Sequence, residues 1–148
     1  MAFRFPLQAV LHFREGIEHQ QQLRFRTANQ RVAKARHLLE QVQQLRLQVR
    51  SEQSKELGAG TTAAELRFGL LREAELERQI RELEQQVTAL EQAREQQRKI
   101  FQQAKRARET LESVRERQFH EYRKQQLRRE QRNMDDLYLM RQKFLRRG

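Results

Sequence analysis

Apolar residues recur at every third or fourth position along most of this chain, with charged and amide side chains between them. The first series consists of Leu7, Val10, Ile17, Ala28, Ala35, Leu38, Val42, Leu45 and Val49. The second consists of Leu76, Ile80, Leu83, Val87, Leu90, Phe101, Ala104 and Leu111, and it continues less regularly to Phe144. Such spacing puts the apolar side chains on one face of an α-helix. The pattern predicts two long helices, over about residues 6–55 and 63–146, separated by a turn at about residues 56–62.

The predicted turn has the residues that end one helix and start another. Gly58 and Gly60 favour the positive φ found where many helices end. Thr62 stands three residues before Glu65, the spacing of a capping box, in which each side chain accepts a hydrogen bond from the other residue's backbone N–H. We therefore expect one helix to end near Gly58 and the next to begin near Thr62. Pro6 suits the first position of the first helix, where its missing N–H costs nothing.

The two apolar series match each other when the helices are placed antiparallel. With the turn centred on Ala59, residues whose numbers add up to about 118 should face each other, as in a coiled coil. Val42 then meets Leu76, and the polar interruption at Gln21 meets the one at Gln97. This agreement predicts an all-α fold, an antiparallel coiled-coil hairpin of two long helices, with an overhanging C-terminal helix.

Next to this glutamine pair, the same register sets Arg24 against Arg94. Two like charges in one layer repel each other, so both side chains should extend outward along their aliphatic stems. We expect this layer of the hairpin to be underpacked.

The overhang begins after residue 117, because Met1 pairs near that residue in this register and later residues have no facing residue in the first helix. An isolated helix is marginal in water, so the overhang is either a frayed, solvated tail or a segment that inserts into a partner. Its apolar residues are Phe119, Tyr122, Leu127, Leu137, Met140 and Phe144. Its basic stretch contains Arg123, Lys124, Arg128, Arg129 and Arg132.

Composition narrows the class of protein. Of 148 residues, 36% are hydrophobic and 34% charged, too little apolar material for a compact core. Full disorder is the alternative fold class, because the net charge is +11. The matching of the two series favours the hairpin. The sequence shows no signal peptide or membrane span, and its lack of Cys fits a reducing compartment.

The residues offer no catalytic or metal-binding constellation. His12 and His19 lie seven residues apart, whereas two His ligands on one helix are usually four apart. Pairs of Glu at helical spacing lack the cleft that acid–base catalysis needs. The chain is therefore predicted to be no enzyme, with no metal, cofactor or small-molecule ligand.

A net charge of +11 also permits binding to nucleic acid. The basic residues are spread along the chain, however, and no dense basic block stands directly before a long zipper. No nucleic acid is expected as a partner, although a basic nucleic-acid-binding coiled coil stays open as an alternative. A general chaperone-like hairpin is a third possibility.

Residues 3–11, followed by Arg14 and Glu15, resemble the opening of the FliJ family of flagellar export proteins. The glycine turn, residues 76–80 and residues 130–136 fit the family as well, so the resemblance covers almost the whole chain. The stalk protein of virulence injectisomes has the same layout and is the nearest alternative.

The resemblance implies a fold, a role and a set of partners. Proteins of this family are antiparallel two-helix coiled coils similar to the central stalk of rotary ATPases. They are cytoplasmic parts of the type III export machinery for flagella and motility, peripheral to the inner face of the cell membrane. Their partners are the hexameric flagellar export ATPase, the membrane protein of the export gate, and export chaperones. This chain is accordingly expected to be a non-enzymatic coupling stalk.

The resemblance also assigns two contact surfaces. The paired termini and the overhang would enter the ATPase ring, and the expected contact residues are Phe119, Tyr122, Arg123, Leu127, Arg128, Leu137 and Met140. The end near the glycine turn would face the export gate, with Leu38, Val42, Leu45, Val49, Leu76 and Leu83 as contact residues. This sequence has aliphatic residues where some members carry aromatic ones. The same positions belong to the predicted coiled-coil core, which is the safer interpretation of Val42 and Leu76.

Overall fold

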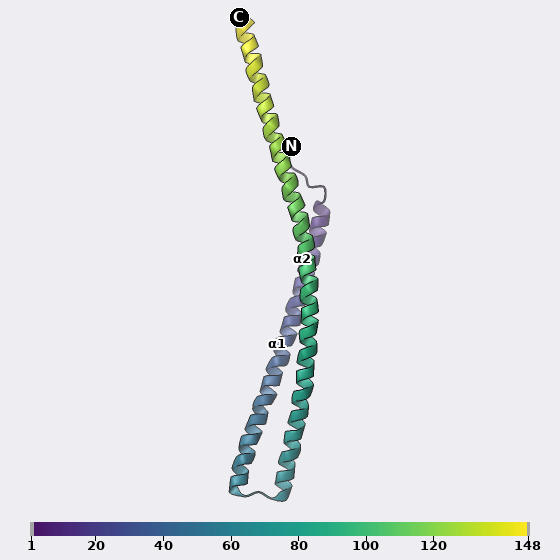
Figure 1. The fold of residues 1–148 in the computed structure, drawn as a ribbon, viewed down its shortest axis with the longest axis vertical. Helices are drawn as coiled ribbons and strands as arrows, with labels where there is room; N and C mark the ends of the chain where they lie inside the picture. Colours follow the sequence, from purple (N-terminus) through teal and green to yellow (C-terminus); the bar gives the residue numbers. More distant parts are fainter. Residues whose placement is uncertain (1, 148) are drawn as a thin grey trace. The chain divides into compact units, whose positions relative to one another are not determined.

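The computed structural model describes residues 2–147 of the chain. It contains two helices and, within the described residues, no strand: α1 spans Gln8–Ala59 and α2 spans Ala63–Arg147 (Figure 1). The two helices pack against each other as a hairpin, which confirms the predicted all-α fold class. Pro6 lies in a turn ahead of α1, where the backbone N–H of Gln8 donates to the carbonyl of Phe5.

The connection between α1 and α2 has the predicted chemistry. Gly60 adopts a φ of 93°, the left-handed conformation that Gly tolerates best. The Glu65 N–H donates to the Thr62 hydroxyl at 3.2 Å, and the Thr62 N–H donates to the Glu65 carboxylate at 3.4 Å. The predicted capping box is therefore confirmed. Gly58 is helical, so α1 continues about one turn further than its predicted end.

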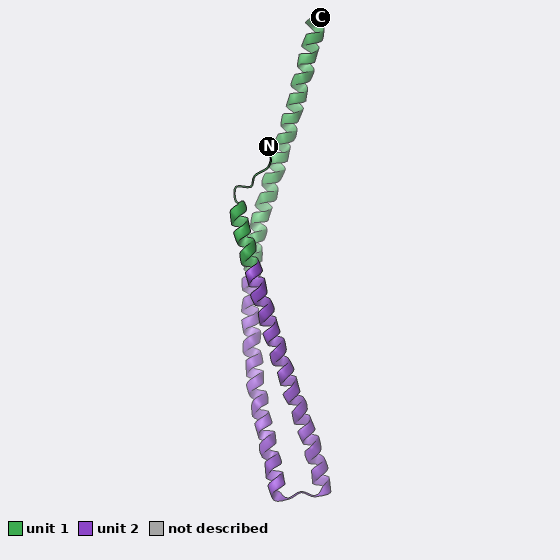
Figure 2. Cartoon of the chain, turned by 180° about the vertical axis from the view of Figure 1, so that it is seen from behind, with its two compact units in different colours: residues 1–18, 103–148 green, residues 19–102 purple. Residues whose placement is uncertain are grey.

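The contacts divide the chain into two units, which Figure 2 shows in different colours. Unit 2 consists of residues 19–102, and its parts of α1 and α2 run antiparallel on either side of the turn. Its buried apolar side chains are Val32, Ala35, Val49, Leu76, Ile80 and Val87. All three of those on α2 belong to the predicted apolar series.

Near the turn, the register of unit 2 differs from the predicted one. Arg46 contacts Glu77 and Arg50 contacts Glu73, each five residues beyond the expected partner, whereas Gln21 contacts its predicted partner Gln97. The cause is the longer α1, because the connection is centred near Thr61, two residues later than assumed. Moving the centre by two residues moves the pairing by about four, which keeps the same helix faces together.

The seam on α1 also differs from the prediction at alternate positions. Leu38 and Leu45 are exposed, whereas their neighbours Leu39 and Arg46 are half-buried. Both sets lie one turn from Val42, and the apolar pattern favours Leu38 and Leu45, because Arg46 is charged. Packing against α2 decides which set faces inward.

Unit 1 consists of residues 1–18 and 103–148, and Leu11 and Phe5 are its buried residues among those described. The ring of Phe3 lies 5.4 Å from that of Phe119 and 5.5 Å from that of Tyr122. The expectation that these two aromatics lack an internal partner is therefore wrong. Phe3, which lies ahead of α1, reaches both Phe119 and Tyr122. The predicted pairing of Met1 lies outside the described residues.

Candidate interaction surfaces

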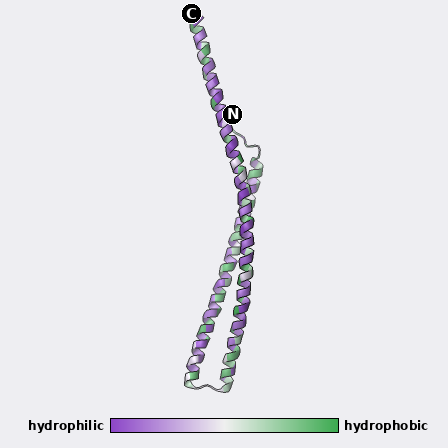
Figure 3. Cartoon of the chain, viewed as in Figure 1, coloured by the Kyte–Doolittle hydropathy of each residue, from purple (hydrophilic) through white to green (hydrophobic). Residues whose placement is uncertain are grey.

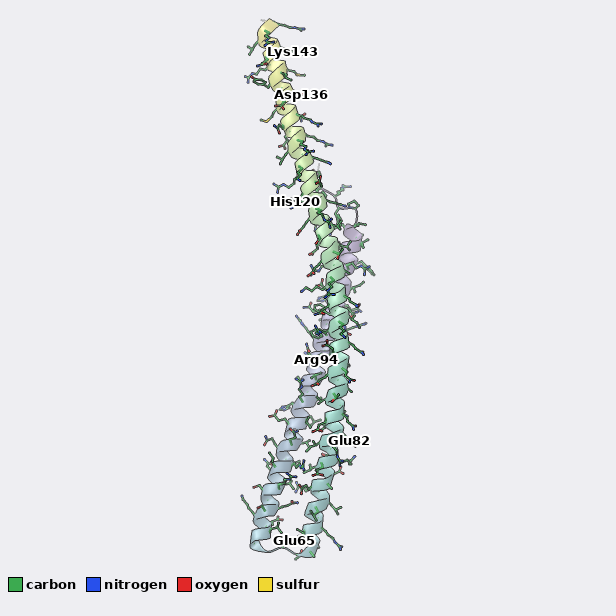
Figure 4. All side chains as sticks on the ribbon, viewed as in Figure 1. Glu65, Glu82, Arg94, His120, Asp136 and Lys143 are labelled. Carbon is green, nitrogen blue, oxygen red and sulfur yellow. The ribbon has the colours of Figure 1, made fainter. Side chains whose placement is uncertain are left out.

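The end of α2, residues 123–147, is here named the C-terminal segment. Every residue in it except Gln126 is exposed. Leu127, Leu137 and Met140, three of the expected ATPase contacts, are each about two thirds exposed. Figure 4 shows side chains projecting from the helix around Asp136 and Lys143. The C-terminal segment thus presents apolar groups that nothing in the described part of unit 1 covers.

The other expected contacts in this region have neighbours within the unit. Tyr122 is half-buried near Phe3, so it supports the fold of unit 1 as well. The guanidinium of Arg123 lies 5.8 Å from the centre of the Phe119 ring, a cation–π arrangement. Arg128 is exposed. The predicted contacts omitted the exposed side chains of Tyr138 and Leu139, which the apolar run at residues 137–140 could have indicated. They also omitted the exposed Met134 and Leu145.

The six expected gate contacts fall into three classes of exposure. Val49 and Leu76 are 3% and 6% exposed, so they belong to the hairpin core. Val42 and Leu83 are half-buried. Leu38 and Leu45 are 48% and 40% exposed and lie seven residues apart on one face of α1. We name this pair the outer stripe, and it is the accessible part of the expected gate surface.

A second apolar surface lies on both sides of the turn and was not predicted. It consists of the exposed side chains of Leu57, Leu66, Phe68, Leu70 and Leu71, which we name the tip patch. The hydropathy colouring of Figure 3 shows the apolar start of α2 in green. Residues 57–71 contain two charges, Glu65 and Arg67, in a chain that is 34% charged. This local loss of charge is the sequence signal that could have identified the tip patch.

The tip is loosely packed as well as apolar. A hollow of about 600 Å³ beside the turn is lined by both helices, including Gln53, Phe68 and Arg72. Gly69 leaves room for the Gln53 side chain, since a Cβ built on Gly69 would lie 2.6 Å from Gln53 Nε2. Polar and small residues therefore take the place of a hydrophobic core in this last part of unit 2.

Ion pairs connect the helices within each unit. In unit 2, Arg on α1 meets Glu on α2 three times, at Arg36–Glu91, Arg46–Glu77 and Arg50–Glu73. In unit 1, Arg108 contacts Glu18 on α1 and Glu112 on α2. The hydrogen bond from Arg108 to Glu18 raises the pKa of the guanidinium, so Arg108 stays positively charged. Surface pairs of this kind contribute little energy each, but they define which positions face each other.

In the part of the chain that the structure describes, no three His, Cys, Asp or Glu side chains gather as a metal site would require. Neither α1 nor α2, over those residues, contains an apolar stretch able to cross a bilayer.

Comparison with known proteins gives one match. No curated protein and no solved structure matches the chain. The family described as flagellar FliJ protein matches residues 3–148, which is nearly the whole length. Proteins of this family are non-catalytic components associated with flagellar protein export. With its helical hairpin and a match over almost every residue, the chain belongs to the flagellar FliJ protein family.

Proposed function

We propose that this protein is a coupling stalk that links the hexameric flagellar export ATPase to the membrane protein of the export gate. It acts in the cytoplasm, at the inner face of the cell membrane, and it also contacts export chaperones. The observation that carries the proposal is the exposed C-terminal segment, whose apolar and basic side chains are left uncovered by the described residues of unit 1.

The ATPase end of the stalk is the C-terminal segment. A lone helix with exposed Leu137, Met140 and Phe144 gains stability only when these side chains pack against something. Its basic residues, among them Arg128 and Arg132, favour a partner surface that carries negative charge at its edge. The central opening of a ring is a surface that a single rod can enter.

The gate end of the stalk lies at the turn. Of the residues expected there, Leu38 and Leu45 are available for contact, while Val49 and Leu76 hold the helices together. The tip patch extends the same apolar character to the turn. Clusters of exposed apolar side chains are candidate interaction sites.

Binding assays with two matched variants test the proposal. Leu137→Glu with Met140→Glu places charges in the C-terminal segment, and Leu70→Glu with Leu71→Glu places them in the tip patch. All four residues are exposed, so both variants should fold as the parent does. We expect the first variant to lose affinity for the purified ATPase hexamer by at least about tenfold, the loss typical of an interface anchor, and to keep its affinity for the gate protein.

The tip variant should lose affinity for the gate protein and keep its affinity for the ATPase hexamer. If both variants bind the ATPase as tightly as the parent, the ATPase end is not the C-terminal segment. Duplex DNA at moderate salt serves as a third ligand. Tight binding to DNA that falls steeply with salt, without binding to the ATPase, would favour a nucleic-acid-binding protein instead.

A further inference from the structure

In unit 2, α1 has two overlapping stripes, and only one of them faces α2. Ala35, Val42 and Val49 belong to both stripes, at intervals of seven. Over residues 35–49, the observed seam completes them with Leu39 and Arg46, which lie four residues after the shared positions, and the fully buried Val32 continues the same seam toward Ala28. Over the same residues, the unused stripe would complete them with the outer stripe, which lies three residues after the shared positions and is apolar, whereas its continuation toward Ala28 has Arg31 in place of Val32.

The observed seam includes an unfavourable residue. The side chain of Arg46 is 25% exposed, and its Nη2 donates to the Glu77 carboxylate at 2.5 Å. Its Nε is buried and has no hydrogen-bond partner among the described residues. A buried donor without a partner costs free energy. At the preceding position, Leu45 is 40% exposed, so water contacts an apolar side chain while a guanidinium occupies the seam.

A small rotation of α1 exchanges the two stripes. Successive helix residues are 100° apart. The centre of the seam lies midway between each shared position and the residue that completes it, so replacing the fourth residue by the third turns the seam by half of 100°, about 50°. Such a rotation about the helix axis breaks no backbone hydrogen bond within α1. Ala35, Val42 and Val49 remain at the seam in both arrangements.

We propose that α1 has two packing states against α2 in unit 2. In the observed state, the Arg46–Glu77 pair lies at the seam and the outer stripe is exposed. The ion pairs Arg36–Glu91 and Arg50–Glu73 also connect α1 to α2 in this state. In the second state, Leu38 and Leu45 are buried and Arg46 reaches solvent. The outer stripe is then a surface that the hairpin exposes in one state and hides in the other.

This switch gives the outer stripe a means of regulation. A ligand shifts a two-state equilibrium by its difference in affinity for the two states. A partner that docks on Leu38 and Leu45 binds the observed state alone, so it holds α1 in that rotation. The identity of that partner as the export gate rests on the proposed function, whereas the two packing states do not.

Cysteine labelling tests the two states in the free protein, which has no native Cys. Single variants Leu45→Cys and Leu39→Cys report the exposure of each stripe through their rates of reaction with a maleimide. In the parent background, Cys at position 45 should react faster. Adding Glu77→Gln removes the charge that holds Arg46, so position 45 should slow and position 39 should quicken, each by about threefold or more, which is roughly 0.7 kcal/mol.

Two control backgrounds separate rotation from loosening of the hairpin. Glu75→Gln removes a carboxylate that pairs with Arg78 on the same helix, and both labelling rates should stay as in the parent. Arg46→Leu makes the observed seam apolar, so position 45 should stay reactive even with Glu77→Gln. Unchanged rates in the Glu77→Gln background would overturn the proposal. An increase at both positions would also overturn it, because it indicates local unfolding rather than an exchange of stripes.

Discussion

At the scale of single residues, a hydrogen-bonded glutamine layer marks a polar interruption in unit 2. The Gln97 amide donates to the Gln21 amide oxygen at 2.6 Å, and both side chains are half-buried. This pairing was predicted from the coincidence of two polar positions and is confirmed. A hollow of about 430 Å³ adjoins the layer and is lined in part by Arg24. Arg24 is exposed, whereas Arg94, which was expected to extend outward as well, is half-buried.

Replacing one glutamine of this layer should destabilise unit 2 more than replacing both. Gln97→Leu leaves the Gln21 amide without its partner, so the free energy of unfolding should fall by about 1 kcal/mol. Gln21→Leu combined with Gln97→Leu removes both amides, and the stability should return to that of the parent or exceed it. Urea unfolding followed by circular dichroism measures the three values. A double variant weaker than either single variant would show that the layer is not a hydrogen-bonded pair.

The glycines of the turn should respond differently to the same substitution. Gly60→Ala imposes a side chain on a residue with a φ of 93°, so it should destabilise the protein by about 1–2 kcal/mol. Gly58→Ala adds a methyl group at a helical position with no atom within 4 Å, so it should stabilise by about 0.5–1 kcal/mol. Thermal unfolding of the two variants gives the comparison. Equal effects would mean that the turn does not have this conformation.

At the scale of the elements, the sequence predicts α2 better than α1. The apolar series of α2 includes its buried residues Leu76, Ile80 and Val87. On α1, Leu38 and Leu45 were placed in the core, but the structure exposes them, because two stripes share Val42 and packing against α2 places Leu39 and the charged Arg46 in the seam instead. Near the turn the predicted register was also wrong, since Gly58 could end a helix but remains helical.

The charges on α2 should make its stability depend on pH. Hydrogen bonds from Arg78 and Arg98 lower the pKa of Glu75 and of Glu95, respectively. Because each pKa is lower in the folded state, the pairs stabilise the helix above the unfolded carboxyl value of about 4.3. This stabilisation is lost as the pH falls through the folded values.

Urea midpoints measured between pH 6 and pH 3 test this expectation. The parent should lose more stability on acidification than a variant with Arg78→Gln and Arg98→Gln, which lacks both donors. Both carboxylates are solvent-exposed, so the difference should shrink in high salt. A variant that loses as much stability as the parent would show that these pairs do not contribute.

At the scale of the whole molecule, the two matching apolar series and the turn between them are sufficient to predict a hairpin. The family match over residues 3–148 assigns it to flagellar export. Surfaces are harder to predict than elements, because exposure depends on packing that periodicity does not determine. The apolar periodicity did not predict the tip patch, which only the local loss of charge indicates. Val49 and Leu76 were expected as contacts but are buried, as the core interpretation already favoured for Leu76 requires.

The hairpin should form within one chain. Gln21→Cys and Gln97→Cys in the same molecule should be joined by a short bis-maleimide as a monomer, because their parent side chains are hydrogen-bonded. Gln21→Cys with Gln85→Cys is the matched control, since position 85 lies twelve residues, or about 18 Å, before position 97 on α2. Cross-linked dimers in place of monomers would mean that α1 pairs with α2 of a second copy.

Hydrogen–deuterium exchange with and without the export ATPase tests the stalk proposal most directly. In the free protein, amides of residues 127–147 should exchange fast, because these residues are all exposed. With the ATPase hexamer bound, the same amides should become strongly protected, while those of residues 28–49 should change little. Equal exchange of the C-terminal segment in both samples, at an ATPase concentration that saturates binding, would contradict its place in the ring.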